Sequence, residues 1–206
     1  MSEYDHEPIR GLPGYLPEGE EIIWQGAPDW LVLARTAFHT RLIGVYFMLL
    51  IALGIASGSV TGAVATGIAG LLAIGLLMLF AWLVARTTVY TLTNRRVVLR
   101  IGVALNKCIN LPLTLIGAAD LSERGGGHGD IALALTGAHR LGYAMLWPHA
   151  RPWKFSDPQP MLRALPDAAR VASLLAQASA AVVEIDRSVE PRRTAPHSGG
   201  LQESPA

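Results

Sequence analysis

The chain has 206 residues, of which 51% are hydrophobic and 16% charged, and its formal net charge is +1. A charge this small, with no basic run interleaved with aromatic residues, excludes the usual kind of nucleic-acid-binding surface. The single cysteine, Cys108, excludes an internal disulfide and a metal site built from several thiolates.

The first 41 residues precede the main hydrophobic stretch. Residues 1–17 contain three prolines and two glycines, so we expect an extended segment there. Residues 18–41 are expected to hold a first strand over Glu20–Gln25 and then an amphipathic lead-in helix from Asp29. In that helix, Trp30 suits the headgroup region of a membrane.

Residues 42–85 contain no charged residue, no histidine and no proline. One helix of this length would extend about 66 Å, roughly twice the thickness of a hydrocarbon core. The stretch therefore predicts a transmembrane helical hairpin, with helices over about 42–58 and 63–85 and a turn at Gly58–Gly62. A buried core hairpin in a soluble protein is the alternative, but soluble core helices rarely lack every charge.

Basic residues flank both ends of the predicted hairpin, whereas its turn carries no charge. Arginine and lysine near membrane-spanning ends favour the cytoplasmic side. We therefore expect a multi-pass protein of the inner (intracytoplasmic) membrane with both termini cytoplasmic.

Small residues recur at intervals of four within the hairpin, at Gly54, Gly58 and Gly62 and at Ala65, Ala69 and Ala73. Such spacing lets helix backbones approach closely in lipid. We assign Gly58 and Gly62 to the turn and the alanine row to a face packed against the first span or a partner helix. A homodimer is compatible with these rows.

The hydrophobic pattern changes after Arg86, where residues 86–183 predict a cytoplasmic β domain with a closing helix over about 167–183. Residues 187–206 have no periodicity and predict a disordered tail. The expected strands are Thr87–Leu92, Val97–Ile101, Cys108–Leu113, Ile131–Thr136 and Leu141–Trp147. We expect Asp120 and Glu123 to be solvated loop charges.

The run Tyr90-Thr91-Leu92-Thr93-Asn94-Arg95-Arg96 resembles the signature of bacterial pleckstrin-homology-like (PH-like) domains of the YdbS type. The resemblance covers roughly residues 18–121. It implies an α+β membrane protein in which a two-helix transmembrane hairpin is inserted in a small PH-like β-barrel or sandwich capped by a C-terminal helix.

Other segments resemble the PuhB family of photosynthetic complex assembly proteins of purple bacteria. That resemblance implies a non-enzymatic integral membrane factor that binds assembly intermediates of the photosynthetic reaction centre and the core light-harvesting complex. Its partners would be subunits of these complexes or their assembly factors. It implies no catalytic residues. The segments are His6–Pro13, Trp24–Trp30, Leu146–Trp153, Pro160–Arg163 and Pro166–Ala169.

Candidate partner-binding residues lie in a proline-stiffened aromatic loop. Aromatic and arginine side chains are over-represented at interaction hot spots, and a stiff loop loses little entropy on binding. The alternative is that the tryptophans pack over the core of the β domain. The candidates are Trp147, His149, Arg151 and Trp153, together with Trp24 and Trp30.

Two further interpretations assign small-molecule or lipid ligands. Arg95 and Arg96 are candidate lipid-facing residues of a headgroup-binding module, or else turn residues that obey the positive-inside bias. His39, next to the first span, is a weak candidate ligand for bacteriochlorophyll in a pigment delivery protein, or else an interfacial polar residue. We expect no metal site and no enzymatic activity, because no catalytic motif is present. The glycine-rich run Gly125–Gly129 predicts a flexible connection between strands.

Overall fold

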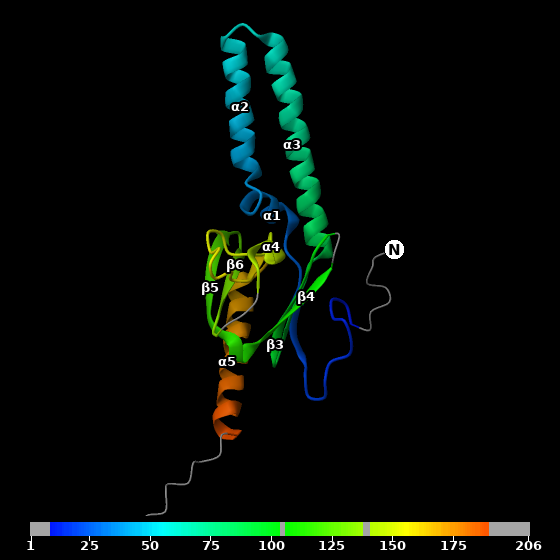
Figure 1. Cartoon of the computed structure of the whole chain (residues 1–206), viewed down its shortest axis with the longest axis vertical. Coiled ribbons are helices and arrows are strands. Elements are labelled where there is room, and N and C mark those ends of the chain that lie inside the picture. The colour runs from blue at the N-terminus through cyan, green and yellow to red at the C-terminus, as the bar shows by residue number, and fades with distance from the viewer. Residues whose placement is uncertain (1–8, 104–105, 138–140, 190–206) are drawn as a thin grey trace, which may run out of the picture.

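A computed structural model describes residues 9–103, 106–137 and 141–189. A long helical hairpin stands on one end of a β domain, and a helix runs along the side of that domain (Figure 1). Parts of the predicted N-terminal segment and of the predicted disordered tail, residues 1–8 and 190–206, lie outside the described residues. The elements in chain order are β1 (Ile22–Gly26), α1 (Trp30–Thr36), α2 (Thr40–Ala56), α3 (Val60–Thr87), β2 (Val89–Thr93), β3 (Arg96–Ile101), β4 (Lys107–Pro112), the 3₁₀ turn η1 (Leu113–Leu115), β5 (Ile116–Gly125), β6 (His128–Leu135), α4 (Tyr143–Leu146), β7 (Met161–Leu165) and α5 (Ala168–Val189).

The strands form two antiparallel sheets, one in the order β1-β2-β3-β4 and the other in the order β5-β6-β7. The β2–β3 turn follows from its sequence, because the Thr93 hydroxyl accepts the backbone N–H groups of Arg95 and Arg96. The two sheets share one apolar core but do not pair edge to edge, so the described strands do not close into a barrel.

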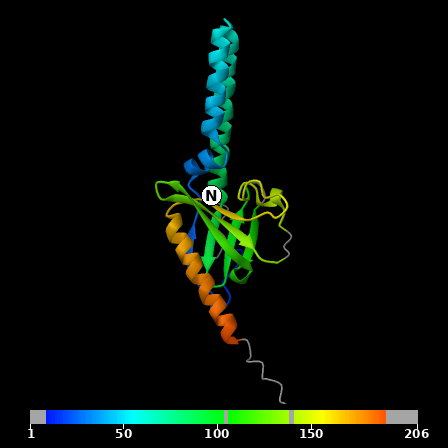
Figure 2. The ribbon, with the colours of Figure 1, turned by 90° about the vertical axis from the view of Figure 1, so that its left-hand side faces the viewer.

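Helix α5 covers the core along one side of the strands (Figure 2). Its apolar stripe of Val171, Leu175 and Ala178 is buried, as the helical spacing predicts. The helix continues to Val189, beyond the predicted end at residue 183 and into the first residues assigned to the tail.

Two other predictions about the β domain were wrong, and one strand was missed. Residues 116–125, which include Asp120 and Glu123, form strand β5 and not a loop. The expected strand over Leu141–Trp147 is the short helix α4 with flanking loop. Strand β7 (Met161–Leu165) was not predicted at all, because it follows directly after a proline-rich passage.

Helices α2 and α3 pack side by side and join at a turn in which Gly58 has a φ of 76°, a conformation that favours glycine. Helix α3 is long and apolar enough to cross a membrane, and only 17% of its most apolar 18-residue window is buried. Helix α2 has 17 residues and follows α1 across a 56° bend. A buried core helix would hide most of its side chains, so the exposed apolar surface of this hairpin is unlike a soluble core.

Contact between α2 and α3 uses small residues other than the predicted alanine row. A Cβ on Gly70 would lie 2.8 Å from Phe47, and a Cβ on Gly54 would lie 3.2 Å from Ala63. Ala65 and Ala69 of that row are exposed, so they do not pack on α2, and contact of the row with a partner helix stays a prediction.

Candidate functional site: a pocket at the base of the helical hairpin

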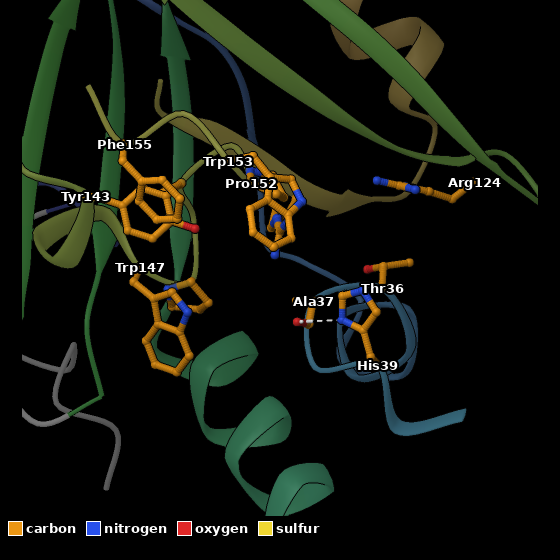
Figure 3. Close-up of a pocket in the computed structure, with 12 residues that line it drawn as sticks. Thr36, Ala37, His39, Arg124, Tyr143, Trp147, Pro152, Trp153 and Phe155 are labelled. Carbon is orange, nitrogen blue, oxygen red and sulfur yellow. Dashed lines mark hydrogen bonds between the residues drawn. The ribbon is translucent and has the colours of Figure 1, made fainter. Parts of the chain in front are cut away.

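A cavity of about 350 Å³ lies where the hairpin meets the β domain, and we call it the junction pocket. Four segments of the chain line it: the α1–α2 junction, the end of β5, α4 with the loop after it, and β7 (Figure 3). Its polar or aromatic lining includes Thr36, His39, Arg124, Trp147, Trp153 and Arg163.

One wall of the pocket is an aromatic cluster that joins the loop after α4 to the hairpin. The Trp147 ring stacks on Phe80 of α3, with centroids 5.8 Å apart and planes at 22°. It also meets Phe38 edge-on at 6.0 Å. Because Trp147 is still 52% exposed, it both anchors the loop and presents a surface.

The outer rim of the pocket is more exposed. Trp153 is 85% exposed and Phe155 60% exposed, and the Phe155 ring packs on Tyr143 with centroids 4.7 Å apart. Trp153 also has a φ of 64°, which is unusual for a residue with a side chain. Of the predicted partner-binding residues, Trp153 is therefore the one with most of its surface available.

Two arginines line the pocket, and among the described residues only Arg124 has a carboxylate partner. Arg124 Nε and Nη2 each lie 2.8 Å from Oδ2 of the buried Asp130. The other carboxylate oxygen of Asp130 accepts the Ala164 N–H at 2.8 Å. Arg163 is only 6% exposed, and its Nε donates to the weak acceptor Met161 Sδ at 3.3 Å. Burial lowers the pKa of the Arg163 guanidinium, although the negative charge of Asp130 opposes this shift.

His149, a predicted partner-binding residue, lies in the interior beneath the pocket and cannot contact a partner. Its side chain is fully buried, with Nδ1 2.7 Å from the Tyr90 hydroxyl and Nε2 3.2 Å from the Thr88 hydroxyl. Burial lowers the pKa of His149 to about 3, and the positive charge of Arg163 adds to the shift. The imidazole is therefore neutral at physiological pH.

Arg151 holds the aromatic loop against the three-stranded sheet. Its Nη1 lies 2.6 Å from Asp120 Oδ2 on β5 and 3.0 Å from Gln159 Oε1. The Arg151 guanidinium therefore has a structural role within the domain, and this role explains why an arginine occurs in the aromatic loop even if no partner protein binds it.

Arg95 and Arg96 do not support the lipid-facing interpretation. Their turn lies at the end of the four-stranded sheet farthest from the hairpin (Figure 1). Arg96 donates through Nε and Nη2 to the buried Glu20 carboxylate at 2.8 and 3.0 Å. The turn also bonds residues 19–21 through Asn94, which donates to the Gly19 carbonyl and accepts the Glu21 N–H.

The remaining predicted residues are dispersed. Trp24 packs against the main core, and Trp30 begins α1 with 36% of its surface exposed. His39 is exposed at the α1–α2 junction, where its Nδ1 lies 3.3 Å from the Ala37 carbonyl oxygen. The described residues contain no cluster of three or more metal-ligating side chains.

The two pocket arginines were missed by sequence reasoning. Arg163 belongs to a segment that indicates only a family resemblance, and Arg124 adjoins a glycine run that predicts no site. One signal was present for Arg163: it is a lone charge inside the apolar run Met161–Leu165, and buried charges require a structural or functional reason.

A family model described as the bacterial PH domain matches residues 40–179. The chain belongs to the bacterial PH domain family. A relative from Rhodobacter capsulatus, described as an uncharacterized 23.7 kDa protein in the puhA 5′ region, is 42% identical over 191 residues. The match covers 87% of this chain and 88% of the relative. No solved structure matches the chain.

Proposed function

We propose that this protein is a non-enzymatic, integral membrane assembly factor for the photosynthetic reaction centre and the core light-harvesting complex. The R. capsulatus relative is described by its position in the puhA 5′ region, and this supports a role related to photosynthesis. The observation that carries the proposal is the combination of an apolar, exposed helical hairpin with an exposed aromatic loop at its base.

In this proposal the hairpin crosses the inner membrane twice and leaves both termini in the cytoplasm. At 1.5 Å per residue, α2 extends about 26 Å and α3 about 42 Å, which suits a hydrocarbon core of about 30 Å. The bend before α2 lets α1 lie at the membrane surface. Lipid and the helices of a partner then cover the exposed apolar side chains of α2 and α3.

The aromatic loop supplies the second contact. Trp153 and Phe155 lie at the base of the hairpin, where the cytoplasmic face of a partner membrane protein would meet the β domain. Large aromatic side chains at such positions contribute much of the binding energy in protein interfaces. The factor would thus hold a reaction-centre or antenna subunit, or another assembly factor, by binding alone.

Deletion of the gene in its phototrophic host tests this function. We expect near-infrared absorbance of the reaction centre and core antenna to fall while total membrane protein stays constant. Complementation with the wild-type chain should restore the bands, and so should the Arg95→Gln variant, which alters an exposed turn far from the hairpin. Unchanged pigment–protein bands in the deletion strain would reject the assembly role.

A further inference from the structure

Arg163 is a buried cation that forms no ion pair with any residue that the structure describes. Among the described residues, no carboxylate lies within 4.0 Å of its guanidinium, and its one side-chain hydrogen bond is donated to the sulfur of Met161. Buried charges in proteins are normally paired, because removing an ion from water costs several kcal/mol. Asp130 acts on Arg163 through its charge but makes no direct bond to it, since its two oxygens bind Arg124 and the Ala164 backbone N–H.

The junction pocket has room for the missing anion. Arg163 and Arg124 both line it, and Figure 3 shows Arg124 with its guanidinium directed toward the side of the pocket that carries Trp153. The volume of about 350 Å³ falls in the range of small-molecule sites. Arginine presents paired N–H donors that match the oxygens of a phosphate group.

The position of the pocket indicates where that phosphate comes from. His39 lines the pocket and immediately precedes α2, whose exposed apolar side chains begin at Leu42. With the hairpin in a membrane, the pocket lies at headgroup level. Trp147 and Trp153 border it there, and tryptophan side chains favour the membrane interface.

We propose that the junction pocket binds the phosphate of an anionic phospholipid headgroup, with Arg163 as the principal donor and Arg124 as the second. The aromatic wall packs against the glycerol portion of the same lipid. This inference depends on the membrane insertion stated under the proposed function. It assigns lipid recognition to the base of the hairpin and not to the β2–β3 turn.

The test uses the full chain purified in a non-ionic detergent, with melting temperature followed by tryptophan fluorescence. The probes are short-chain phosphatidylglycerol, diacylglycerol with the same acyl chains, and inorganic phosphate. We expect phosphatidylglycerol at about 100 times its Kd to raise the melting temperature by roughly 5 °C. Diacylglycerol should cause no shift, and inorganic phosphate should need a much higher concentration.

Two variants distinguish lipid binding in the junction pocket from a nonspecific effect of the protein's positive charge. Arg163→Met should abolish the phosphatidylglycerol shift, while its melting temperature without lipid should equal or exceed that of the wild type, since an unpaired buried charge is removed. Thr36→Glu keeps both arginines but adds a carboxylate to the pocket wall, and it should also abolish the shift. Arg95→Gln is the control with one positive charge fewer, and it should keep the full shift.

Each outcome decides one part of the inference. A full lipid shift in Arg163→Met would reject the pocket, and if that variant does not fold, a full shift in Thr36→Glu would reject it equally. An equal response to phosphatidylglycerol and inorganic phosphate at one concentration would reject the lipid as the occupant. The assembly role is measured independently by the near-infrared spectra of the deletion strain, so failure of one proposal is distinguishable from failure of the other.

Discussion

The Tyr90 hydroxyl lies 2.7 Å from His149 Nδ1, and this contact joins strand β2 to the loop beneath the junction pocket. The same hydroxyl accepts the backbone N–H of Arg163 at 3.2 Å, so its own proton is available to Nδ1. His149 then carries its proton on Nε2 and donates it to the Thr88 hydroxyl at 3.2 Å. All polar atoms are satisfied only if the imidazole is neutral, which agrees with its lowered pKa.

This arrangement predicts that His149 makes folding stability depend on pH. Its pKa is about 3 in the folded protein and about 6.5 when unfolded, so only the unfolded state binds a proton between these values. The free energy of unfolding therefore does not depend on His149 protonation well above pH 6.5, and it decreases as the pH falls from 6.5 toward 3. Between pH 7 and pH 5 we expect a loss of about 2 kcal/mol. Unfolding free energies in detergent at several pH values measure it.

His149→Gln isolates the effect, because glutamine keeps a hydrogen-bond donor and acceptor but does not titrate. The difference in unfolding free energy between wild type and variant should change by about 2 kcal/mol from pH 7 to pH 5. His39→Gln, at an exposed position, should leave the wild-type slope intact. Parallel pH profiles for wild type and His149→Gln would contradict a neutral, buried imidazole.

Gly70 and Gly75 form a matched pair for testing the packing of the hairpin. A Cβ on Gly70 would lie within 3.0 Å of three Phe47 atoms, including its Cβ, whereas one on Gly75 meets nothing within 4 Å. We expect Gly70→Ala to destabilise the hairpin by about 1–3 kcal/mol through overpacking. Gly75→Ala should be neutral or slightly stabilising. Thermal unfolding in detergent compares them, and equal melting temperatures would contradict the α2–α3 contact.

The Glu20–Arg96 pair explains part of the family signature in structural terms. Glu20 is 7% exposed, accepts two hydrogen bonds from Arg96 and a third from the Thr93 hydroxyl at 2.8 Å. Glu20→Gln should therefore lower the unfolding free energy by about 2 kcal/mol, the scale of hydrogen bonds to charged groups. Glu21→Gln, at an exposed position, is the control. If the two variants unfold alike, the buried pair has no structural importance.

The hairpin and the β2–β3 turn were predictable because their signals are local. An uncharged run of 44 residues has to be two helices, and alternating apolar residues around Asn94 have to be a strand pair. Strand β5 has no such signal, because nine of its ten residues are exposed and no apolar alternation marks it. The expected strand at Leu141–Trp147 failed because a short apolar run does not distinguish strand from helix.

The junction pocket was beyond sequence reasoning for a different reason. Its arginines come from β5 and β7, and its aromatic side chains come mostly from the loop after α4, where Trp147 stacks on Phe80 of α3. No pattern in the sequence predicts that these segments lie next to one another in the fold. His149 shows the converse: it belongs to an aromatic motif that is typical of an interface, yet it is fully buried.

Trp147 and Trp153 belong to one loop but should have separable roles. Trp147 stacks on Phe80 and meets Phe38, so Trp147→Ala should lower the unfolding free energy by about 2 kcal/mol. The Trp153 side chain is 85% exposed, and Trp153→Ala should leave stability within about 0.5 kcal/mol of wild type. Thermal unfolding of the purified variants measures both effects.

The same two variants then test partner binding in the deletion strain. If the exposed loop holds an assembly intermediate, Trp153→Ala should restore less reaction-centre and core-antenna absorbance than wild type, at equal protein level in the membrane. Loss of a hot-spot tryptophan typically costs 2 kcal/mol or more, a roughly 30-fold weaker interaction. Trp153→Phe, which keeps an aromatic ring, should recover part of the loss. Full complementation by Trp153→Ala would mean that the partner does not use this rim of the pocket.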